Sequence, residues 1–356
     1  MAERVLTLHE LNRATLARQL LLERKRLSPL KVIEHLVGMQ AQWPSAPYLG
    51  IWSRTTSFRP KTLERELVKG TVLKANLMRQ TLHLVTRRDY ALLRAAISES
   101  ALVWSQAEVE RLHPDQWPDP IIVAPSVRAL AEAGPVTMAE GLAHLEQMHG
   151  LTGIRARRAW HGGRMRAHVL HHHETALWRG RPEGRFVAID EPEPLDPTEA
   201  RAEMLRRYLA AFGPASRKDM DAWSMMRQPA IKAALARIEP LRRFRDENGR
   251  ELLDFERAPL PDPETPAPVR FLPKWDNVLL AFADRTRVLP EEYRRVVIKS
   301  NGDVAQTFLV DGRVAGMWRF EGGRVALEPF VRLGPSVRRE VDDEAERLAA
   351  FLSADA

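Results

Sequence analysis

Two proline-rich segments interrupt the chain, and neither a regular helix nor a central strand can run through them. They lie at residues 190–197 and 259–268 of a chain of 356 residues. Proline lacks an amide donor and fixes φ, so both segments are expected to be extended linkers. Since a domain usually has about 150 residues, this length predicts two or three domains. With the linkers, the chain divides into about three blocks and a tail.

Within the blocks one order recurs, short helices followed by a β-hairpin. Ser28 stands as an N-cap before a proline, and Thr137 with Glu140 forms a capping box. Asn248-Gly249 is a type I′ turn signal. Helix, helix and hairpin are the outline of a winged helix-turn-helix unit. The predicted helices are 8–23, 29–39, one from about 60, one from 137, 164–174, one from 216, and 229–238; the predicted strands or hairpins are 77–86, 176–189 and one around 248–249.

The tail has a different pattern. Residues 306–330 read as three strands joined at Asp311-Gly312 and Gly322-Gly323, and a helix is predicted over 336–352. The expected fold class is therefore α+β, with three tandem winged helix-turn-helix units and a small antiparallel β-rich C-terminal domain. The expected boundaries are 1–125 for the first unit, 126–190 for the second, 198–258 for the third and 268–356 for the C-terminal domain.

Positive charge is concentrated in the first half of the chain. The net charge is +7, and residues 1–190 carry 27 basic and 18 acidic side chains. Residues 155–166 hold five arginines and no acid. This favours a polyanionic partner, although a solvated basic face explains the charge equally well. Trp160, which lies among the arginines, tilts the interpretation towards nucleic acid.

Several function classes are disfavoured by what the sequence lacks. It has no cysteine, which excludes disulfides, thiol nucleophiles and thiolate zinc sites. No apolar run approaches the roughly 18 residues of a membrane span, and the first ten residues lack the pattern of a signal peptide. We therefore expect a soluble cytoplasmic protein. There is no GxxxxGK[ST] and no GxGxxG, so nucleotide binding is poorly supported.

Two clusters of titratable residues are candidates for chemistry. His168, His171 and His172 would share one face of the predicted helix 164–174. Because the chain has neither a His-Glu-x-x-His pattern nor cysteine, we expect no metal and interpret this as a polar face near a phosphate. Asp276 and Asp284 are eight residues apart and could form a catalytic pair, but structural Asp–Arg contacts are the favoured alternative.

The most informative candidate is a pair of glutamines. Gln40 and Gln42 would point to the same side of an extended segment, beside Trp43. Each amide has a donor and an acceptor, so the pair can hold one water or read a base edge. The spacing alone favours helix-end capping as the alternative.

Motifs along nearly the whole chain carry a family resemblance. They are residues 38–48, 77–85, 271–280, 284–287 and 308–316. Through them the chain resembles the winged-helix DNA-binding family that includes the bacterial alkylpurine DNA glycosylases of the AlkZ and YcaQ type. The resemblance implies three tandem winged helices with a β-rich tail. One departure is Gln80, because the family's second motif often reads Met-Arg-Gly-Thr.

The resemblance also implies roles for individual residues. Gln40 and Gln42 match the family's catalytic Gln-x-Gln element, Trp43 would form a wall of the site, and Arg79 and His83 would lie near the DNA backbone. Residues 179–185 have the composition of a wing, although an exposed basic turn is as good an interpretation. The further basic side chains expected to bind DNA are Arg164, Arg166, Arg179, Arg181 and Arg185.

The resulting hypothesis is a monofunctional DNA glycosylase for N7-alkylated purines, extending to bulky adducts or interstrand crosslinks. It would act as a monomer on double-stranded DNA, in the cytoplasm at the nucleoid, without metal or cofactor. It would serve genome defence, or self-resistance in a producer of a DNA-alkylating compound. The alternative is a non-enzymatic winged-helix protein, either a transcriptional regulator or a lesion binder.

Overall fold

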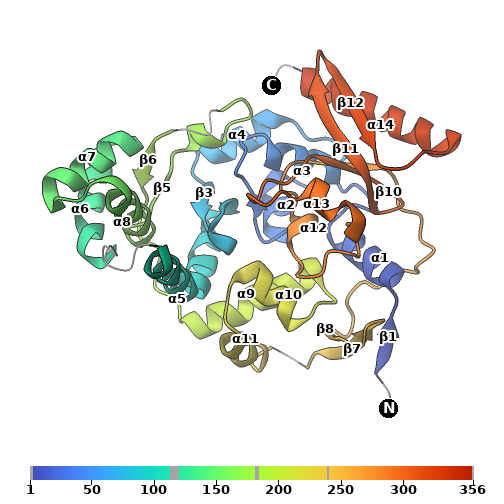
Figure 1. The fold of residues 1–356 in the computed structure, drawn as a ribbon, viewed down its shortest axis with the longest axis horizontal. Coiled ribbons are helices and arrows are strands. Elements are labelled where there is room, and N and C mark those ends of the chain that lie inside the picture. The colour runs from blue at the N-terminus through green and yellow to red at the C-terminus, as the bar shows by residue number, and fades with distance from the viewer. Residues whose placement is uncertain (1–2, 113–119, 181–183, 239, 355–356) are drawn as a thin grey trace.

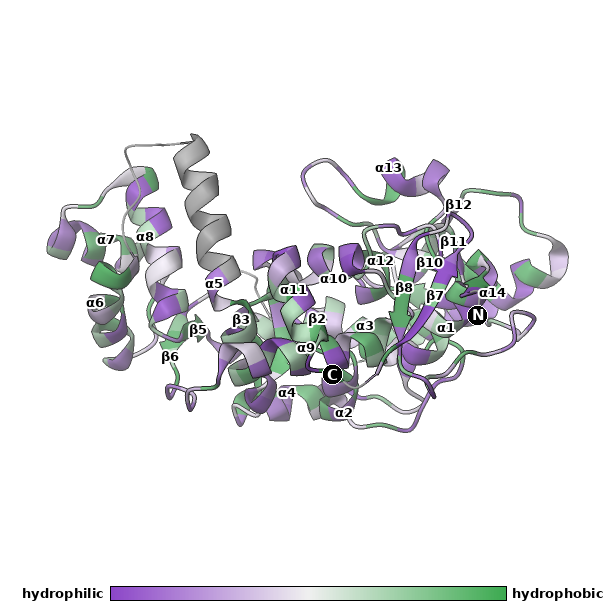
Figure 2. Ribbon diagram, turned by 90° about the horizontal axis from the view of Figure 1, so that it is seen from below, coloured by the Kyte–Doolittle hydropathy of each residue, from purple (hydrophilic) through white to green (hydrophobic). Residues whose placement is uncertain are grey.

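The computed structural model describes residues 3–112, 120–180, 184–238 and 240–354. Helices alternate with three small sheets, whose strand orders are β2-β4-β3-β5-β6, β1-β7-β8 and β12-β11-β10-β9. The chain is therefore of the mixed α+β class, as predicted. The molecule is elongated, with α6–α8 at one end and the sheet of β9–β12 at the other (Figures 1 and 2).

The N-terminal segment contributes to two of these sheets. Ser28 caps α2 as predicted, since its side chain accepts a hydrogen bond from the backbone of Lys31. The predicted strand 77–86 is only half present, because a left-handed turn at Arg79 and Gln80 precedes β4. The elements here are β1 (Arg4–Leu6), α1 (Leu8–Arg18), α2 (Pro29–His35), β2 (Met39–Gln40), α3 (Ala46–Arg54), α4 (Pro60–Val68), β3 (Val72–Asn76), the 3-10 helix η1 (Met78–Gln80), β4 (Leu82–Thr86) and α5 (Arg87–Leu112).

The next segment differs most from expectation. The predicted helix 164–174 is wrong, because α8 ends at Arg166 and Val169–His171 form a strand. Val169 and Leu170 are buried there, and this burial in the sheet outweighs helical periodicity. The elements here are α6 (Pro120–Glu132), α7 (Met138–His149), α8 (Gly153–Arg166), β5 (Val169–His171), the 3-10 helix η2 (His173–Ala176) and β6 (Phe186–Ala188).

The predicted hairpin over 176–189 is also wrong. Its second half, β6, pairs with β5 and not with residues 176–180. Ala176 is instead held by the Tyr48 hydroxyl, which donates to its carbonyl at 2.9 Å, and Trp178 packs on the Tyr48 ring. A contact with a residue more than 120 positions away therefore decides the conformation of this segment.

The Thr137–Glu140 capping box opens α7 as predicted.

The third block follows the predicted order. The two predicted helices, α10 and α11, precede an antiparallel hairpin whose turn contains Asn248 and Gly249, and Ser216 caps α10. Two features were not predicted. The long helix α9 precedes the predicted helices, and β1 pairs in parallel with β7, so the N-terminus extends the sheet of this block. The elements are α9 (Pro197–Phe212), α10 (Arg217–Ser224), α11 (Gln228–Leu235), β7 (Arg242–Asp246) and β8 (Glu251–Asp254).

The C-terminal block contains the three predicted strands and the closing helix. A fourth strand, β9, joins them from the motif at residues 271–280 by pairing with β10. The elements are β9 (Arg270–Leu272), α12 (Asn277–Leu280), the 3-10 helix η3 (Glu291–Tyr293), α13 (Arg294–Val297), β10 (Thr307–Val310), β11 (Arg313–Glu321), β12 (Arg324–Pro329) and α14 (Pro335–Ser353).

The apolar cores cross the block boundaries. One core joins β3, β4 and α5 to α9–α11 and reaches Phe282. A second joins α2–α4 to β9–β11 and α14. A third core, among the described residues, is formed by α6–α8, β5 and β6. The first block is thus packed against both the third block and the C-terminal block, and the residue at the centre of the candidate site, Gln40, lies on a strand of that first block.

Candidate active site

The segment that carries the two glutamines is preceded by a glycine in a backbone conformation that other residues rarely adopt. Gly38 has φ +94°, and a Cβ there would lie 2.9 Å from the Val85 side chain. Only glycine adopts this backbone without strain. It lets β2 approach β4 closely, where Met39 pairs with Leu84 and Gln40 with His83.

Both glutamine side chains point to the same turn, residues 79–82. Nη2 of Arg79 donates to Oε1 of Gln40 at 2.7 Å, and the backbone N–H of Leu82 donates to Oε1 of Gln42, also at 2.7 Å. A guanidinium and a backbone N–H can only donate, so these bonds fix which way each amide faces. The helix-end capping alternative is wrong, because both carbonyl oxygens are held by the turn and its flanking strand.

Exposure differs along this segment. Gln40 is buried at 5% exposure, Gln42 is half-buried, and the Trp43 side chain is 51% exposed. The segment therefore runs from the interior to the surface within four residues. A tryptophan exposed to this extent presents a flat apolar face to a partner.

Arg79 is the cation of this site. It adopts a left-handed backbone with φ +54°, and Gln80 follows with φ +59°, where the related family often has glycine. Burial and the charge of Arg285 lower the pKa of Arg79 to about 10, so the guanidinium stays charged at neutral pH. Besides Gln40, it donates to the carbonyl of Trp223 at 3.4 Å. The turn thus places a partly buried positive charge directly against the Gln40 carbonyl.

His83 lies inside the protein. Its ring is 1% exposed, and Nδ1 lies 2.9 Å from the Thr81 carbonyl, which can only accept, so Nδ1 carries the proton. Burial and the Arg79 charge lower the pKa of His83 to about 3. The imidazole is therefore neutral at physiological pH and stabilises the turn. Its predicted contact with DNA stays a prediction.

These values predict acid sensitivity. The pKa of His83 is about 3 when folded and about 6.5 when unfolded, so between these pH values only the unfolded chain binds a proton. The contribution of the neutral His83 to the free energy of unfolding is fully present above pH 6.5. It is lost as the pH decreases towards 3, by about 1.4 kcal/mol per pH unit for one such group. Urea unfolding at pH 7, 6 and 5 measures this slope.

Two other histidines add to this effect, because burial lowers the pKa of His161 to about 4 and that of His171 well below its usual value. The variant His83→Asn retains a donor for the Thr81 carbonyl but does not titrate. It should lower the slope of the free energy of unfolding against pH by the contribution of one proton. An unchanged slope in this variant would contradict the assignment to His83.

Two of the other arginines predicted to bind DNA, Arg164 and Arg185, have partners outside the glutamine segment. Arg164 is buried, donates to the Val169 carbonyl at 3.1 Å and stacks on Phe186. Arg166 and Arg179 are exposed, and Arg185 is exposed and paired with Glu174 at 3.1 Å. Arg181 lies outside the described residues, as does part of the predicted wing 179–185.

The histidine cluster and the aspartates have structural partners. Because the helix 164–174 does not form, His168 bonds to the Tyr90 hydroxyl at 2.9 Å while His172 lies 3.2 Å from Glu174. No group of three or more metal-ligating side chains occurs within the described residues. Asp276 pairs with Arg54, and Asp284 with Arg250, so the Asp–Arg interpretation is confirmed.

One residue of this site was missed by the sequence analysis. Asn277, at the start of α12, contacts the strand of Gln40 from the C-terminal block. The only signal was its place in the motif at residues 271–280, directly after Asp276. No local pattern relates it to a strand more than 200 residues earlier.

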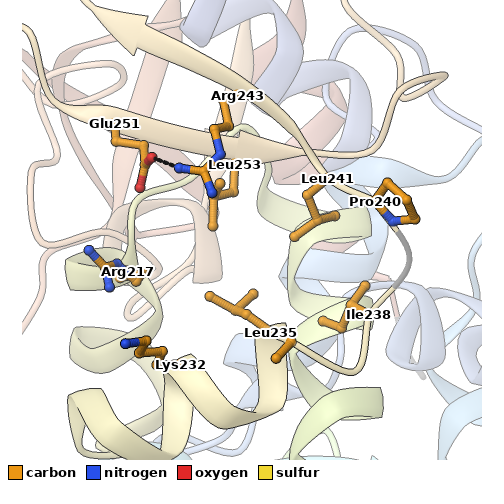
Figure 3. A pocket seen from close by; sticks show the side chains of 10 residues that line it. Arg217, Lys232, Leu235, Ile238, Pro240, Leu241, Arg243, Glu251 and Leu253 are labelled. Carbon is orange, nitrogen blue, oxygen red and sulfur yellow. Dashed lines mark hydrogen bonds and ion pairs between the residues drawn. The ribbon is translucent and has the colours of Figure 1, made fainter.

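A hollow of about 490 Å³ lies elsewhere, between α10, α11 and the β7–β8 hairpin (Figure 3). Arg217 and Lys232 line one side, facing apolar residues such as Leu241. Arg243 is also part of the wall, but it pairs with Glu251. The hollow contains none of the residues predicted from the sequence as site residues.

The site consists of an amide pair beside a partly buried cation, on a chain whose first half is basic. Comparison with known proteins gives the class of this protein. A family model described as DNA glycosylase AlkZ-like matches residues 33–351. The chain therefore belongs to the AlkZ-like DNA glycosylase family. Its relatives are named DNA glycosylases, which are hydrolases of N-glycosyl bonds, so the predicted enzyme class is confirmed and DNA is the substrate.

Individual relatives agree with this assignment. The chain is 25% identical over 359 residues to a protein of Streptomyces sahachiroi named interstrand DNA cross-link repair glycosylase, with 93% of each sequence covered. The solved structure of DNA glycosylase AlkZ from the same organism matches with a TM-score of 0.79 at 20% identity, covering 98% of this chain and 96% of that one. This structural likeness confirms the predicted α+β class. No helix of the described residues is long and apolar enough to cross a membrane.

Proposed function

We propose that this protein is a monofunctional glycosylase that removes N7-alkylated purines, including bulky adducts and crosslinks, from double-stranded DNA. The observation that carries the proposal is the oriented amide pair of Gln40 and Gln42 on a chain of this family. It would act as a monomer on nucleoid DNA in the cytoplasm, without metal or cofactor. The name of the S. sahachiroi relative supports the extension to crosslinks.

The chemistry of the substrate explains why amides suffice. Alkylation at N7 gives the guanine a positive charge. When the C1′–N9 bond breaks, its electron pair stays on N9 and the base leaves neutral, so no general acid is needed. Water then adds to C1′ and releases a proton to solvent, which leaves an abasic site. What the protein must supply is an oriented water and stabilisation of a cationic sugar.

In this proposal the two amides divide those tasks. Each Oε1 has two lone pairs, of which Arg79 or the Leu82 N–H uses one. The second lone pair would accept a hydrogen from the attacking water and turn its oxygen towards C1′. The negative ends of the two carbonyl dipoles would face the developing positive charge of the sugar. Arg79 acts here as a positioning residue, since it holds the Gln40 carbonyl.

We infer further that DNA is held by three winged-helix units with boundaries 1–125, 126–190 and 198–258, followed by the domain 268–356. The order α9–α11 with β7–β8 supports the third unit, and α6–α8 with β5–β6 supports the second. The exposed Trp43, Arg166, Arg179 and Arg185 would contact DNA directly, with Arg181 beyond the described residues. Arg79, His83 and Arg164 would support that surface from inside.

The test is a single-turnover assay on duplex DNA with one N7-methylguanine. Excision of the cationic base leaves an abasic site, which hot alkali converts into a strand break at the position of the lesion. We expect this product with the methylated duplex and none with the same sequence carrying unmodified guanine. The control follows from mechanism, because a normal guanine is a much poorer leaving group.

The opposite result would change the class of function. Tight, salt-sensitive binding without excision, on both the methylated duplex and one carrying a bulky N7 adduct, would favour a regulator or lesion binder. Salt sensitivity by itself does not distinguish a glycosylase from a non-enzymatic DNA-binding protein, since phosphate contacts dominate the DNA affinity of both.

A further inference from the structure

The strand that carries Gln40 has one open edge. β2 is the outermost strand of its sheet and pairs only with β4. On the paired edge, the N–H of Ala41 donates to the Leu82 carbonyl at 2.7 Å. Because successive peptide groups of a strand point to opposite edges, the Gly38 carbonyl and the Gln40 N–H face away from β4. An edge strand of two residues has little of its own to hold it in register.

The side chain of Asn277 lies along this open edge. Its Nδ2 donates to the Gly38 carbonyl at 2.6 Å and to the Leu36 carbonyl at 3.4 Å. Its Oδ1 accepts from the N–H of Gln40, also at 3.4 Å. One primary amide therefore bonds to a carbonyl and an N–H on the same edge, as the peptide group of a neighbouring strand would. The carbonyls that it holds flank Val37 and Gly38, both of which have positive φ.

Asn277 is itself held rigidly. The preceding residue, Asp276, caps α12 by accepting from the Val278 N–H at 3.0 Å. Asp276 also makes two bonds, of 2.7 and 2.8 Å, to the guanidinium of Arg54, and both side chains are at most 1% exposed. Arg54 ends α3, the helix that follows the glutamine segment. The C-terminal block is thereby anchored at both ends of the segment from Gly38 to Arg54.

We propose that Asn277 is a positioning residue for base excision, which completes the open edge of β2 and so fixes the backbone from which the Gln40 amide projects. The inference rests on the proposed role of Gln40 in catalysis. It gives the C-terminal block a part in the active site. Asn277 does not touch the reacting atoms in this proposal; it acts through the strand.

The first arm of the test compares Asn277→Ala and Asn277→Asp with the wild type in single-turnover excision of N7-methylguanine. We expect each to slow excision by about 10- to 100-fold, the effect of misplacing a catalytic group by about 1 Å. The aspartate variant keeps the shape and the acceptor but turns a carboxylate oxygen towards the Gly38 carbonyl. It should be at least as slow as the alanine variant, whereas a residue needed only for packing would tolerate this change. Affinity for undamaged duplex DNA should be unchanged in both.

The chain offers a matched control in Asn12. Its Nδ2 donates to the carbonyls of Arg287 at 2.6 Å and Gly312 at 2.9 Å, so it also joins the N-terminal block to the C-terminal block by a pair of bonds. Asn12→Ala should lower the melting temperature in a similar way and leave the excision rate at the wild-type value. Equal slowing by Asn12→Ala and Asn277→Ala would overturn the proposal, as would a wild-type rate in Asn277→Asp.

A double-mutant comparison asks whether Asn277 acts through Gln40. If it does, Gln40→Ala combined with Asn277→Ala excises no more slowly than Gln40→Ala alone, because the group being positioned is already absent. Additive slowing would overturn the proposal.

A second readout does not depend on activity and separates this proposal from the proposed function. Hydrogen exchange followed by mass spectrometry should show faster exchange of peptides containing residues 38–42 in Asn277→Ala, but not in Asn12→Ala. If the wild type excises nothing, the proposed function fails while faster exchange still supports the strand contact. Unchanged exchange in Asn277→Ala overturns the inference whatever the activity.

Discussion

Gln40→Ala and Gln42→Ala are each expected to lower the single-turnover rate of excision by about 10²–10⁴-fold, the usual contribution of one correctly placed catalytic group. Gln40→Ala removes the side-chain acceptor of Arg79 and one of the two amides that orient the water. Gln42→Ala removes the second amide and the acceptor of the Leu82 N–H. Alkali-cleavable sites formed over time on N7-methylguanine duplex measure both rates.

The control is a glutamine with a similar environment and no place in the site. Gln19 is fully buried and donates to the Ala211 carbonyl at 2.7 Å. Gln19→Ala should lower stability without changing the excision rate. Wild-type excision by both Gln40→Ala and Gln42→Ala, in protein that melts cooperatively, would show that the amide pair is not the catalytic element.

Asp276→Ala is expected to have the largest effect on stability, a loss of about 3–5 kcal/mol. The reason is the partner that remains: the Arg54 guanidinium is 0% exposed and would be left as a buried charge without a counterion. The variant also removes the cap of α12. Denaturant unfolding of the wild type and the variant measures the loss.

A surface pair provides the comparison. Arg338 and Asp342 are also hydrogen bonded, at 2.9 and 3.0 Å, but both side chains are about half exposed. Asp342→Ala should cost less than about 1 kcal/mol, because water screens and replaces that interaction. If the two variants lose similar stability, burial of the Arg54–Asp276 pair does not have the energetic role assigned to it.

Local signals predicted the elements whose partners lie nearby. The caps at Ser28, Thr137 and Ser216 form because a hydroxyl satisfies an N–H three residues away. The Asn248-Gly249 turn joins strands that follow each other directly. In these cases the competing conformations are also local, so the choice between them can be read from a few residues.

The wrong predictions arose where distant contacts decide. Residues 164–174 have a helical pattern, but Val169 and Leu170 complete a sheet that begins with β2, β4 and β3. Residues 176–180 resemble half of a hairpin, but Ala176 and Trp178 are held by Tyr48. In each case contacts with residues far away in the sequence outweigh the local preference.

The candidate site divides in the same way. The sequence alone determined which amides are available, Gln40 and Gln42, and that their spacing puts both on one side of an extended segment. Only the tertiary structure decided that Arg79 and Leu82 orient those amides and that Asn277 completes the strand edge. The physical reason is that hydrogen bonds across 39, 40 and 239 positions form only after the apolar cores have brought the blocks together, and no short-range pattern encodes that arrangement.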